Sequence, residues 1–299
     1  MSTSDVRSSS TQAYLLLALA GLCWSGNHVI GRAIAGHVPP VSLSALRWVM
    51  PFLIMLPFAS RHFSRDWPLI RQHWKVLMVL GLSGGALFSA LQYVGLQYTT
   101  AVNVSVLNSL GPVFIVMAVA IMFHETLRPI QLGGIAISLT GVLFIVTRGE
   151  LASLLEMSFN YGDLIILFNM VVWSIYSAVL RLRPAIHWTS FMAVFAFIGA
   201  MGTLPFAVYE FLQGIRFQPT VTTFLAIVYV SIFPSLVSYM SWNRGVELIG
   251  ANRAGALLHL IPLYSAILAG IFLGEQLASF HIVGFALILA GVTLAARKV

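Results

Sequence analysis

Long apolar runs alternate with short polar connections along almost the whole chain. Ten of these runs, mostly of about 18–23 residues, are long enough to cross a hydrocarbon core about 30 Å thick as helices. They cover Ala13–Ala35, Val41–Ala59, Trp74–Gly95, Ala101–Phe123, Pro129–Thr147, Tyr161–Arg181, Ser190–Leu212, Val221–Trp242, Arg253–Leu273 and His281–Ala296. The longest connections, Ser60–His73 and Arg148–Asn160, leave no room for a soluble domain. The pattern predicts an all-α membrane protein with ten transmembrane helices.

The apolar runs repeat with a nearly constant offset. The run Ala101–Leu127 returns 150 residues later as Ala251–Leu277. The matched positions include Pro112 with Pro262, Glu125 with Glu275, Trp24 with Trp173 and Arg32 with Arg181. Five spans in each half is an odd number, so the second half enters the membrane upside down. We therefore predict two inverted-topology repeats, residues 13–148 and 161–299, which follow a polar tail of residues 1–12 that we expect to be disordered.

Composition and charge agree with this interpretation. The chain is 59% hydrophobic and 8% charged, whereas soluble proteins carry roughly 25% charged residues. The net charge is +7, but the basic residues are scattered singly between apolar runs, which argues against nucleic-acid binding. With the N-terminus inside, twelve Lys and Arg residues lie on the inner side and three on the outer side. The positive-inside rule then places both termini in the cytoplasm.

Polar and aromatic side chains at mid-membrane depth are candidates for substrate binding, because they are costly there unless they face a cavity or another helix. They are Trp24, Asn27 and His28 on one face of the first span, and Trp173, Tyr176 and Ser177 at the corresponding place on the sixth. Trp24 lies roughly 16 Å into its span, near the midplane. The two tryptophans predict an aromatic clamp for a flat substrate. Packing between helices is the alternative interpretation of each residue.

Two prolines interrupt spans at corresponding places in the two halves. A proline within a helix lacks the N–H and clashes with the preceding turn, so Pro112 and Pro262 predict bends that act as gates or only shape the bundle. Asn108 and His259 lie within a turn of these bends and are candidates to bind a substrate amine or carboxylate. Further candidates are Phe88 and Gln92 in the third span and Tyr239 in the eighth, the last also suited to the membrane interface.

The few charged residues near the spans have structural interpretations. Glu125 and Glu275 lie at span ends, where we expect them to tie helices and loops together. Arg47 lies within the second span. We expect it to extend outward to the surface or to pair with Asp163, and attraction of substrate carboxylates is a third option.

Several catalytic motifs are absent from the sequence. There is no G-x-x-x-x-G-K-[ST], no H-E-x-x-H, no C-x-x-C and no convincing Ser-His-Asp set. We therefore expect no catalytic residue, no metal, no cofactor and no ATPase subunit. The lone Cys23 rules out a disulfide within the chain.

The chain resembles the drug/metabolite transporter superfamily, in its ten-helix EamA-type branch. The resemblance covers roughly residues 13–296 and rests on Trp24-Ser-Gly-Asn27 followed by Arg32, and on the Pro112…Glu125 and Pro262…Glu275 patterns. It implies a secondary transporter that exports small metabolites across a bacterial inner membrane by alternating access, and a monomer is one option for its oligomeric state. Within that branch the chain is most similar to aromatic amino acid exporters. The alternatives are export of other flat or cationic metabolites, including toxic compounds, and a membrane enzyme acting on lipid or quinone.

Overall fold

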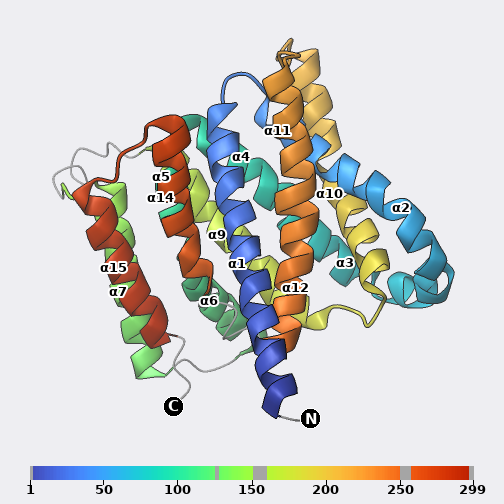
Figure 1. Ribbon diagram of the computed structural model, residues 1–299, viewed down its shortest axis with the longest axis horizontal. Coiled ribbons are helices and arrows are strands. Elements are labelled where there is room, and N and C mark those ends of the chain that lie inside the picture. Colours follow the sequence, from blue (N-terminus) through green and yellow to red (C-terminus); the bar gives the residue numbers. More distant parts are fainter. Residues whose placement is uncertain (1–2, 125–127, 151–159, 250–256, 296–299) are drawn as a thin grey trace.

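The structure, a computed structural model, describes residues 3–124, 128–150, 160–249 and 257–295, and all regular structure in these ranges is helical. The first half contains α1 (Thr3–Ala33), α2 (Pro40–Gln72), α3 (Trp74–Leu80), η1 (Gly81–Leu87), α4 (Phe88–Tyr98), α5 (Ala101–Asn108), α6 (Gly111–Phe123) and α7 (Pro129–Val146). The second half contains α9 (Tyr161–Val179), η2 (Leu180–Leu182), α10 (Trp188–Leu212), α11 (Val221–Ser231), η3 (Ile232–Val237), α12 (Ser238–Ile249), η4 (Leu257–His259), α14 (Leu260–Leu273) and α15 (Ser279–Ala295). In Figure 1 the helices run back and forth between two ends of the molecule, and α1 begins at the end where α15 finishes.

The predicted all-helical membrane fold is confirmed. Seven helical segments of the described chain are long and apolar enough to cross a membrane. The other three predicted spans correspond to the shorter apolar helices Pro129–Ile145, Leu257–Leu273 and Ser279–Leu294. Ten crossings therefore stay a prediction.

Two predicted boundaries were wrong, because both helices extend into polar sequence. The helix α1 begins at Thr3, so residues 3–12 of the tail are helical where disorder was expected. A helix that is already nucleated gains one hydrogen bond for each residue added, and this tail contains neither proline nor glycine. Likewise α2 continues to Gln72. Near its end the buried Asp66 accepts the backbone N–H of His187 at 2.9 Å, which ties the last turns of α2 to the start of α10.

The packing of the helices follows the sequence repeat. The first span, α1, packs on α12 and α14, and its counterpart α9 packs on α4 and α6. Corresponding spans also meet directly, since α2 packs on α10 and α7 on α15. Between α7 and α15 the backbones approach so closely that a Cβ added to Gly141 would lie 2.7 Å from the carbonyl oxygen of Gly284. Gly141, Gly284 and Gly291 of the fifth and tenth spans thus serve helix packing.

The third and eighth spans each contain a π-helical turn, η1 and η3, at corresponding positions. Such turns disturb the regular hydrogen bonds of a helix and are frequent at functional sites. In η1 the carbonyl of Gly84 accepts the hydroxyl of Tyr239 at 3.2 Å. In η3 the carbonyl of Pro234 accepts the indole N–H of Trp24 at 3.1 Å. In each π turn, therefore, an aromatic side chain of the opposite half donates a hydrogen bond to a backbone carbonyl.

Two glutamates cap the starts of helices. Glu275 accepts the backbone N–H groups of Ala101 and Val102, each at 3.1 Å, at the start of α5. Glu210 does the same at the start of α2. A carboxylate at this place satisfies free N–H groups and interacts favourably with the helix dipole. The structural role predicted for Glu275 is confirmed, and Glu125 lies outside the described residues.

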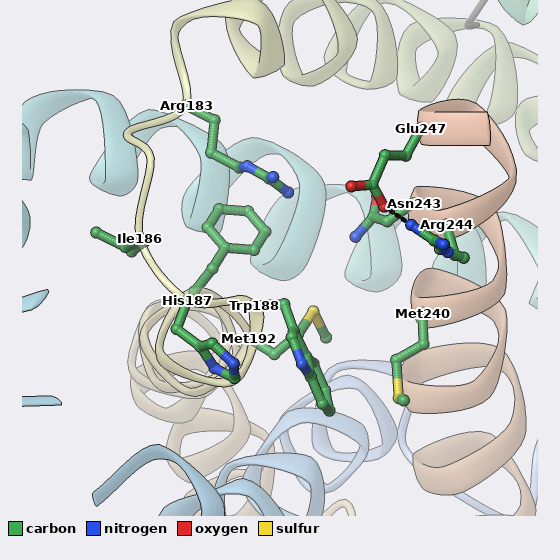
Figure 2. A pocket seen from close by; sticks show the side chains of 10 residues that line it. Arg183, Ile186, His187, Trp188, Met192, Met240, Asn243, Arg244 and Glu247 are labelled. Atoms are coloured by element: carbon green, nitrogen blue, oxygen red, sulfur yellow. Dashed lines mark hydrogen bonds and ion pairs between the residues drawn. The ribbon is translucent and has the colours of Figure 1, made fainter. Parts of the chain in front are cut away.

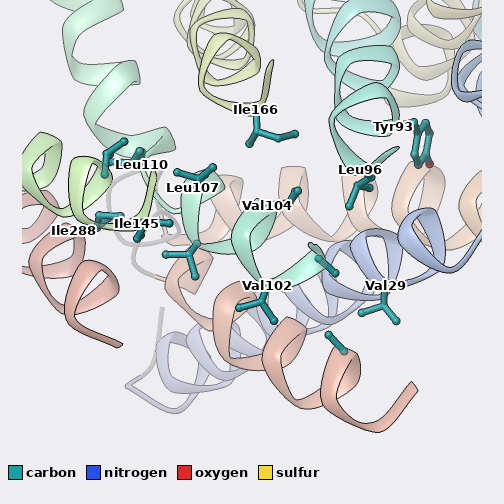
Figure 3. Close-up of a cluster of buried hydrophobic side chains, with 14 of the residues drawn as sticks. Val29, Tyr93, Leu96, Val102, Val104, Leu107, Leu110, Ile145, Ile166 and Ile288 are labelled. Atoms are coloured by element: carbon teal, nitrogen blue, oxygen red, sulfur yellow. The ribbon is translucent and has the colours of Figure 1, made fainter. Parts of the chain in front are cut away.

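The buried apolar side chains form two clusters. Figure 3 shows the first cluster, which includes Val29 of α1, Leu96 of α4, Leu107 of α5 and Ile166 of α9. The second surrounds Trp48 and is rich in aromatic rings. Because the clusters contain residues of both halves, they hold the two halves together and leave a space at the centre.

Candidate functional site

A small cavity lies between the two halves. The first half contributes Trp24, Asn27, His28, Arg47, Phe88, Gln92 and Asn108, and the second half contributes Met170, Trp173, Leu258 and Ile261. Its volume is about 50 Å³, enough for a few water molecules. Residues from six of the predicted spans converge here, so a relative movement of the halves would change the shape of this cavity.

Five of the predicted binding residues line this cavity, and four do not. Those that line it are Trp24, Asn27, His28, Asn108 and Trp173. Phe88 and Gln92, the additional candidates of the third span, also line it.

The other four predicted binding residues lie outside the cavity lining. Tyr176 and Tyr239 are buried among aromatic rings beside it. The hydroxyl of Ser177 donates to the carbonyl of Trp173 on its own helix at 2.8 Å. The ring of His259 lies 6.4 Å from that of Phe285.

A chain of side-chain amides crosses the cavity wall. Gln92 Oε1 accepts Nδ2 of Asn169 at 3.1 Å and Nδ2 of Asn108 at 3.4 Å. Asn108 Nδ2 also lies 3.2 Å from Nε2 of His28, and Nδ1 of His28 lies 3.3 Å from the hydroxyl of Ser265. An amide nitrogen only donates, so Nε2 must accept and the ring proton must lie on Nδ1. The network therefore holds His28 as an uncharged imidazole.

Three polar atoms of this network lack a hydrogen-bond partner within the described part of the chain: Nε2 of Gln92, Oδ1 of Asn108 and Oδ1 of Asn169. Of these three residues, Gln92 and Asn108 line the cavity. Buried polar atoms normally have a partner, and each exception asks for an explanation such as a bound molecule. The cavity wall thus offers one free donor and one free acceptor.

Arg47 neither extends to the surface nor pairs with Asp163, so both of these predictions were wrong. Its side chain is 1% exposed and lines the cavity. Asp163 instead accepts the hydroxyl of Thr99 and the amide of Asn103. The hydrogen bond from Nε of Arg47 to the hydroxyl of Ser235, at 2.8 Å, explains the difference. It directs the guanidinium inward, across the boundary between the halves.

The two tryptophans predicted as a clamp contact each other. The ring centroids of Trp24 and Trp173 are 6.4 Å apart and their planes meet at 78°, so the contact is edge-to-face. Trp24 also contacts Tyr239 and Trp242, with centroids 6.0 Å and 5.7 Å away. Trp24 and Trp173 therefore do not lie face to face as a parallel clamp in this arrangement. The four rings, which we call the aromatic layer, close the cavity on the side toward the beginning of α1.

A larger pocket lies beyond the aromatic layer, at the end of the molecule where α1 begins. We call it the vestibule. It has a volume of about 620 Å³ and is lined by the start of α10, the segment before it and α12. Figure 2 shows Arg183 among the lining residues and the ion pair between Arg244 and Glu247. The guanidinium carbon of Arg183 is 5.0 Å from the Phe191 ring centroid, and the ion pair measures 2.7 Å. The vestibule combines positive charge with apolar walls.

A histidine pair borders the vestibule. The rings of His62 and His187 are stacked with centroids 3.7 Å apart. Partial desolvation lowers the pKa of His187, and the nearby charges of His62 and Arg65 lower it further, against the opposite effect of Asp66. His187 is therefore uncharged at pH 7 and adds no positive charge to the vestibule.

The two prolines begin helices instead of bending them. The helix α5 ends at Asn108 and α6 begins at Gly111, so Pro112 lies in the first turn of α6. Pro262 similarly lies in the first turn of α14, directly after the 3₁₀ turn η4. A missing N–H costs nothing at these positions, because the first turn has no partner for it. The predicted bends are thus helix breaks, and their gating role stays a prediction.

Replacing either proline with alanine is expected to slow transport several-fold while the melting temperature changes by no more than about 3 °C. Alanine at Pro112 or Pro262 restores a donor and allows the break to close into continuous helix, which stiffens the wall of the cavity. Transport into liposomes and thermal unfolding measure the two effects separately. Pro129→Ala, at the exposed start of α7, is the matched control. Parent rates in both variants would show that these prolines are not gates.

Comparison with known protein families finds the EamA-like transporter family, which matches residues 11–147 and again residues 160–297. The chain belongs to this family. The two matched segments leave out the same connection, near residue 150, that separates the halves of the sequence repeat. The chain is therefore a multi-pass membrane transporter of the EamA type.

Individual relatives cover most of the chain at low identity. An uncharacterized transporter of Archaeoglobus fulgidus is 29% identical over 97% of this chain and 99% of its own length. A probable terminal-alkyne amino-acid exporter of Streptantibioticus cattleyicolor is 26% identical, over 79% of this chain and 75% of its own. A probable amino-acid metabolite efflux pump of Salmonella typhimurium is 23% identical, over 92% of each chain. A crystal structure 22% identical in sequence has a TM-score of 0.64 over 95% of this chain and 96% of that one, so the two share a fold.

Proposed function

We propose that this transporter exports small metabolites, and amino acids above all, across the inner membrane of a bacterium. It does so by alternating access, with both chain termini in the cytoplasm and ten spans forming two inverted repeats. The observation that carries this proposal is the central cavity, which both halves line and which contains unpaired buried polar atoms.

The surroundings of the cavity support alternating access. On one side the aromatic layer separates the cavity from the vestibule. On the other side, Val29 and Leu96 of the first apolar cluster follow the cavity residues His28 and Gln92 along their helices. A site between two barriers, exposed to one side at a time, is what such a mechanism requires. The vestibule, at the end predicted to face the cytoplasm, is then the place where the substrate arrives.

The lining of the cavity favours amino acids, and aromatic ones among them. Rings of Trp24, Phe88 and Trp173 offer apolar faces, and the free amide atoms of Gln92 and Asn108 offer hydrogen bonds. Two of the relatives carry names that refer to amino acids. At about 50 Å³ the cavity holds only a polar head group, so a ring enters when the tryptophans part. The positive charge of Arg47 disfavours cationic metabolites.

Counterflow in liposomes that contain the purified full-length protein tests this function. Labelled phenylalanine, tryptophan, threonine and alanine are offered separately, and protein-free liposomes are the control. We expect uptake that depends on the protein, is saturable and is faster for the aromatic substrates. Protein that is correctly folded by thermal unfolding, yet exchanges none of these amino acids, would contradict the proposed substrate class.

A further inference from the structure

The side chain of Arg47 is a cation that the protein does not neutralise locally. It lies seven residues after the start of α2, hence roughly 10 Å from that end of the helix, and is 1% exposed. No carboxylate of the described residues lies within 4 Å of it. A guanidinium stays charged in proteins, and a buried charge without a partner costs several kcal/mol. An anion that enters the cavity would remove this cost.

The guanidinium is held in place by neutral groups and keeps donors to spare. Nε donates to the hydroxyl of Ser235 at 2.8 Å, one Nη to the hydroxyl of Tyr93 at 3.3 Å, and the other Nη to the carbonyl of Pro234 at 3.4 Å. Arginine has five N–H groups in a planar fork, so one N–H on each Nη has no partner among these contacts. The hydroxyl of Tyr93 is itself fixed, because it donates to Oδ1 of Asn27 at 2.6 Å. This arrangement orients the fork in advance.

Gln92 contributes a second, independent donor to the same cavity. It is 1% exposed, and Oε1 accepts the amides of Asn169 and Asn108. These two hydrogen bonds fix the orientation of the side-chain amide, so Nε2 is the free end. Nε2 has no partner in the described part of the chain. A planar group with two negatively charged oxygens would satisfy both the free Nε2 and the fork of Arg47.

We propose that Arg47 and Gln92 form a carboxylate subsite, which makes this protein selective for substrates that carry a carboxylate. The inference rests on the proposed transport of small metabolites through this cavity and specifies which chemical group is recognised there. It explains why a permanently charged side chain is buried between the halves. The subsite also explains why Arg47 donates hydrogen bonds to both halves, since Tyr93 belongs to the first half and Ser235 to the second.

Three probes that share one ring and differ in charged groups test the subsite. They are L-phenylalanine, 3-phenylpropionate, which lacks the amine, and L-phenylalaninamide, which lacks the carboxylate. Stabilisation of the purified full-length protein against thermal unfolding gives the apparent Kd of each. We expect 3-phenylpropionate to bind at least about tenfold more tightly than the amide. Equal binding of the two would overturn the subsite, and so would equal stabilisation by sodium chloride at the same concentration.

Substitutions at Arg47 and Gln92 test whether the preference for 3-phenylpropionate arises at this subsite. Gln92→Glu is nearly isosteric and places a carboxylate in the cavity, where it would neutralise Arg47. We expect it to abolish the preference for 3-phenylpropionate, as should Arg47→Gln, while Arg47→Lys keeps part of it. Gln213→Glu, at the exposed end of α10, is the charge-matched control and should keep the full preference. A preference that survives in folded Gln92→Glu protein would show that Arg47 only braces the helices.

Binding and transport can fail separately. One outcome is that 3-phenylpropionate stabilises the parent but not the Arg47→Gln protein, while phenylalanine is not exchanged in liposomes. This result would support the carboxylate subsite and contradict amino-acid export. If phenylalanine and its amide are exchanged equally well, the result would support transport by this protein and contradict the carboxylate subsite.

Discussion

Replacing Trp24 with alanine is expected to slow the transport of phenylalanine or tryptophan about tenfold, and the transport of alanine or threonine much less. Trp24 lines the cavity and contacts Trp173 edge-to-face. An aromatic substrate would gain about 0.5–1.5 kcal/mol from each ring contact beyond its buried area, and 1.4 kcal/mol corresponds to a factor of ten. Trp173→Ala should have a similar effect, because the two rings flank the same space. Competition between large and small labelled substrates measures the discrimination directly.

Two further variants separate ring contact from packing. Trp24→Phe keeps a ring but removes the N–H that the carbonyl of Pro234 accepts, so we expect it to retain most of the preference for aromatic substrates. Trp74→Ala, a change of the same size at an exposed position, should leave the preference unaltered. Equal losses for large and small substrates in Trp24→Ala protein, at normal membrane expression, would mean that the ring only holds the helices together.

Replacing Gly84 with alanine is expected to destabilise the protein by about 1–3 kcal/mol, the usual cost of overpacking a filled core. A Cβ at this position would lie 2.7 Å from Cγ and Cε2 of Tyr176, and closer still to Cδ2. The ring of Tyr176 cannot move aside, because it is 2% exposed and packs against Trp173 and Phe195. The π turn η1 would have to shift, and with it the carbonyl of Gly84 that Tyr239 binds.

Thermal unfolding of purified Gly84→Ala protein in detergent measures this effect. Gly133→Ala is the matched control, because Gly133 is a helical glycine of α7 whose added Cβ would meet no atom of the other described segments within 4 Å. In a helix interior alanine is intrinsically better than glycine by about 1 kcal/mol, so the control should be slightly stabilised. A Gly84→Ala protein as stable as the control would show that the rings around Tyr176 are loosely packed.

The membrane character and the repeat were predictable from the sequence because both leave one-dimensional signals. A span needs about 20 apolar residues whatever its neighbours are, and helices follow from the bilayer's lack of hydrogen-bonding groups. The offset of the repeat pairs Trp24 with Trp173, whose rings contact each other edge-to-face, while the clamp around a flat substrate stays a prediction. Trp24, Asn27 and His28 could be placed on one face because helical periodicity is fixed.

Other features depended on contacts between distant segments. The extension of α2 to Gln72 relies in part on Asp66 meeting the backbone of a residue 121 positions away. The π turns rely on aromatic donors from the opposite half, such as Tyr239 for Gly84. Neither the extension of α2 nor the π turns can be predicted from hydropathy, because tertiary hydrogen bonds stabilise both.

Arg47 is the clearest example of a residue whose surroundings could not be predicted from the sequence. Its position within an apolar run showed that the charge needed a partner or access to water, but not which one. The tertiary structure decided this, because the hydrogen bonds to Ser235 and Tyr93 direct the guanidinium into the cavity, and Asp163 is bound by other residues. The apolar helices and the repeat could be predicted from the amino-acid pattern alone, because local polarity and helical geometry set both. Only the packing of the helices decided which of the candidate residues share a cavity, since that depends on how two distant halves fit together.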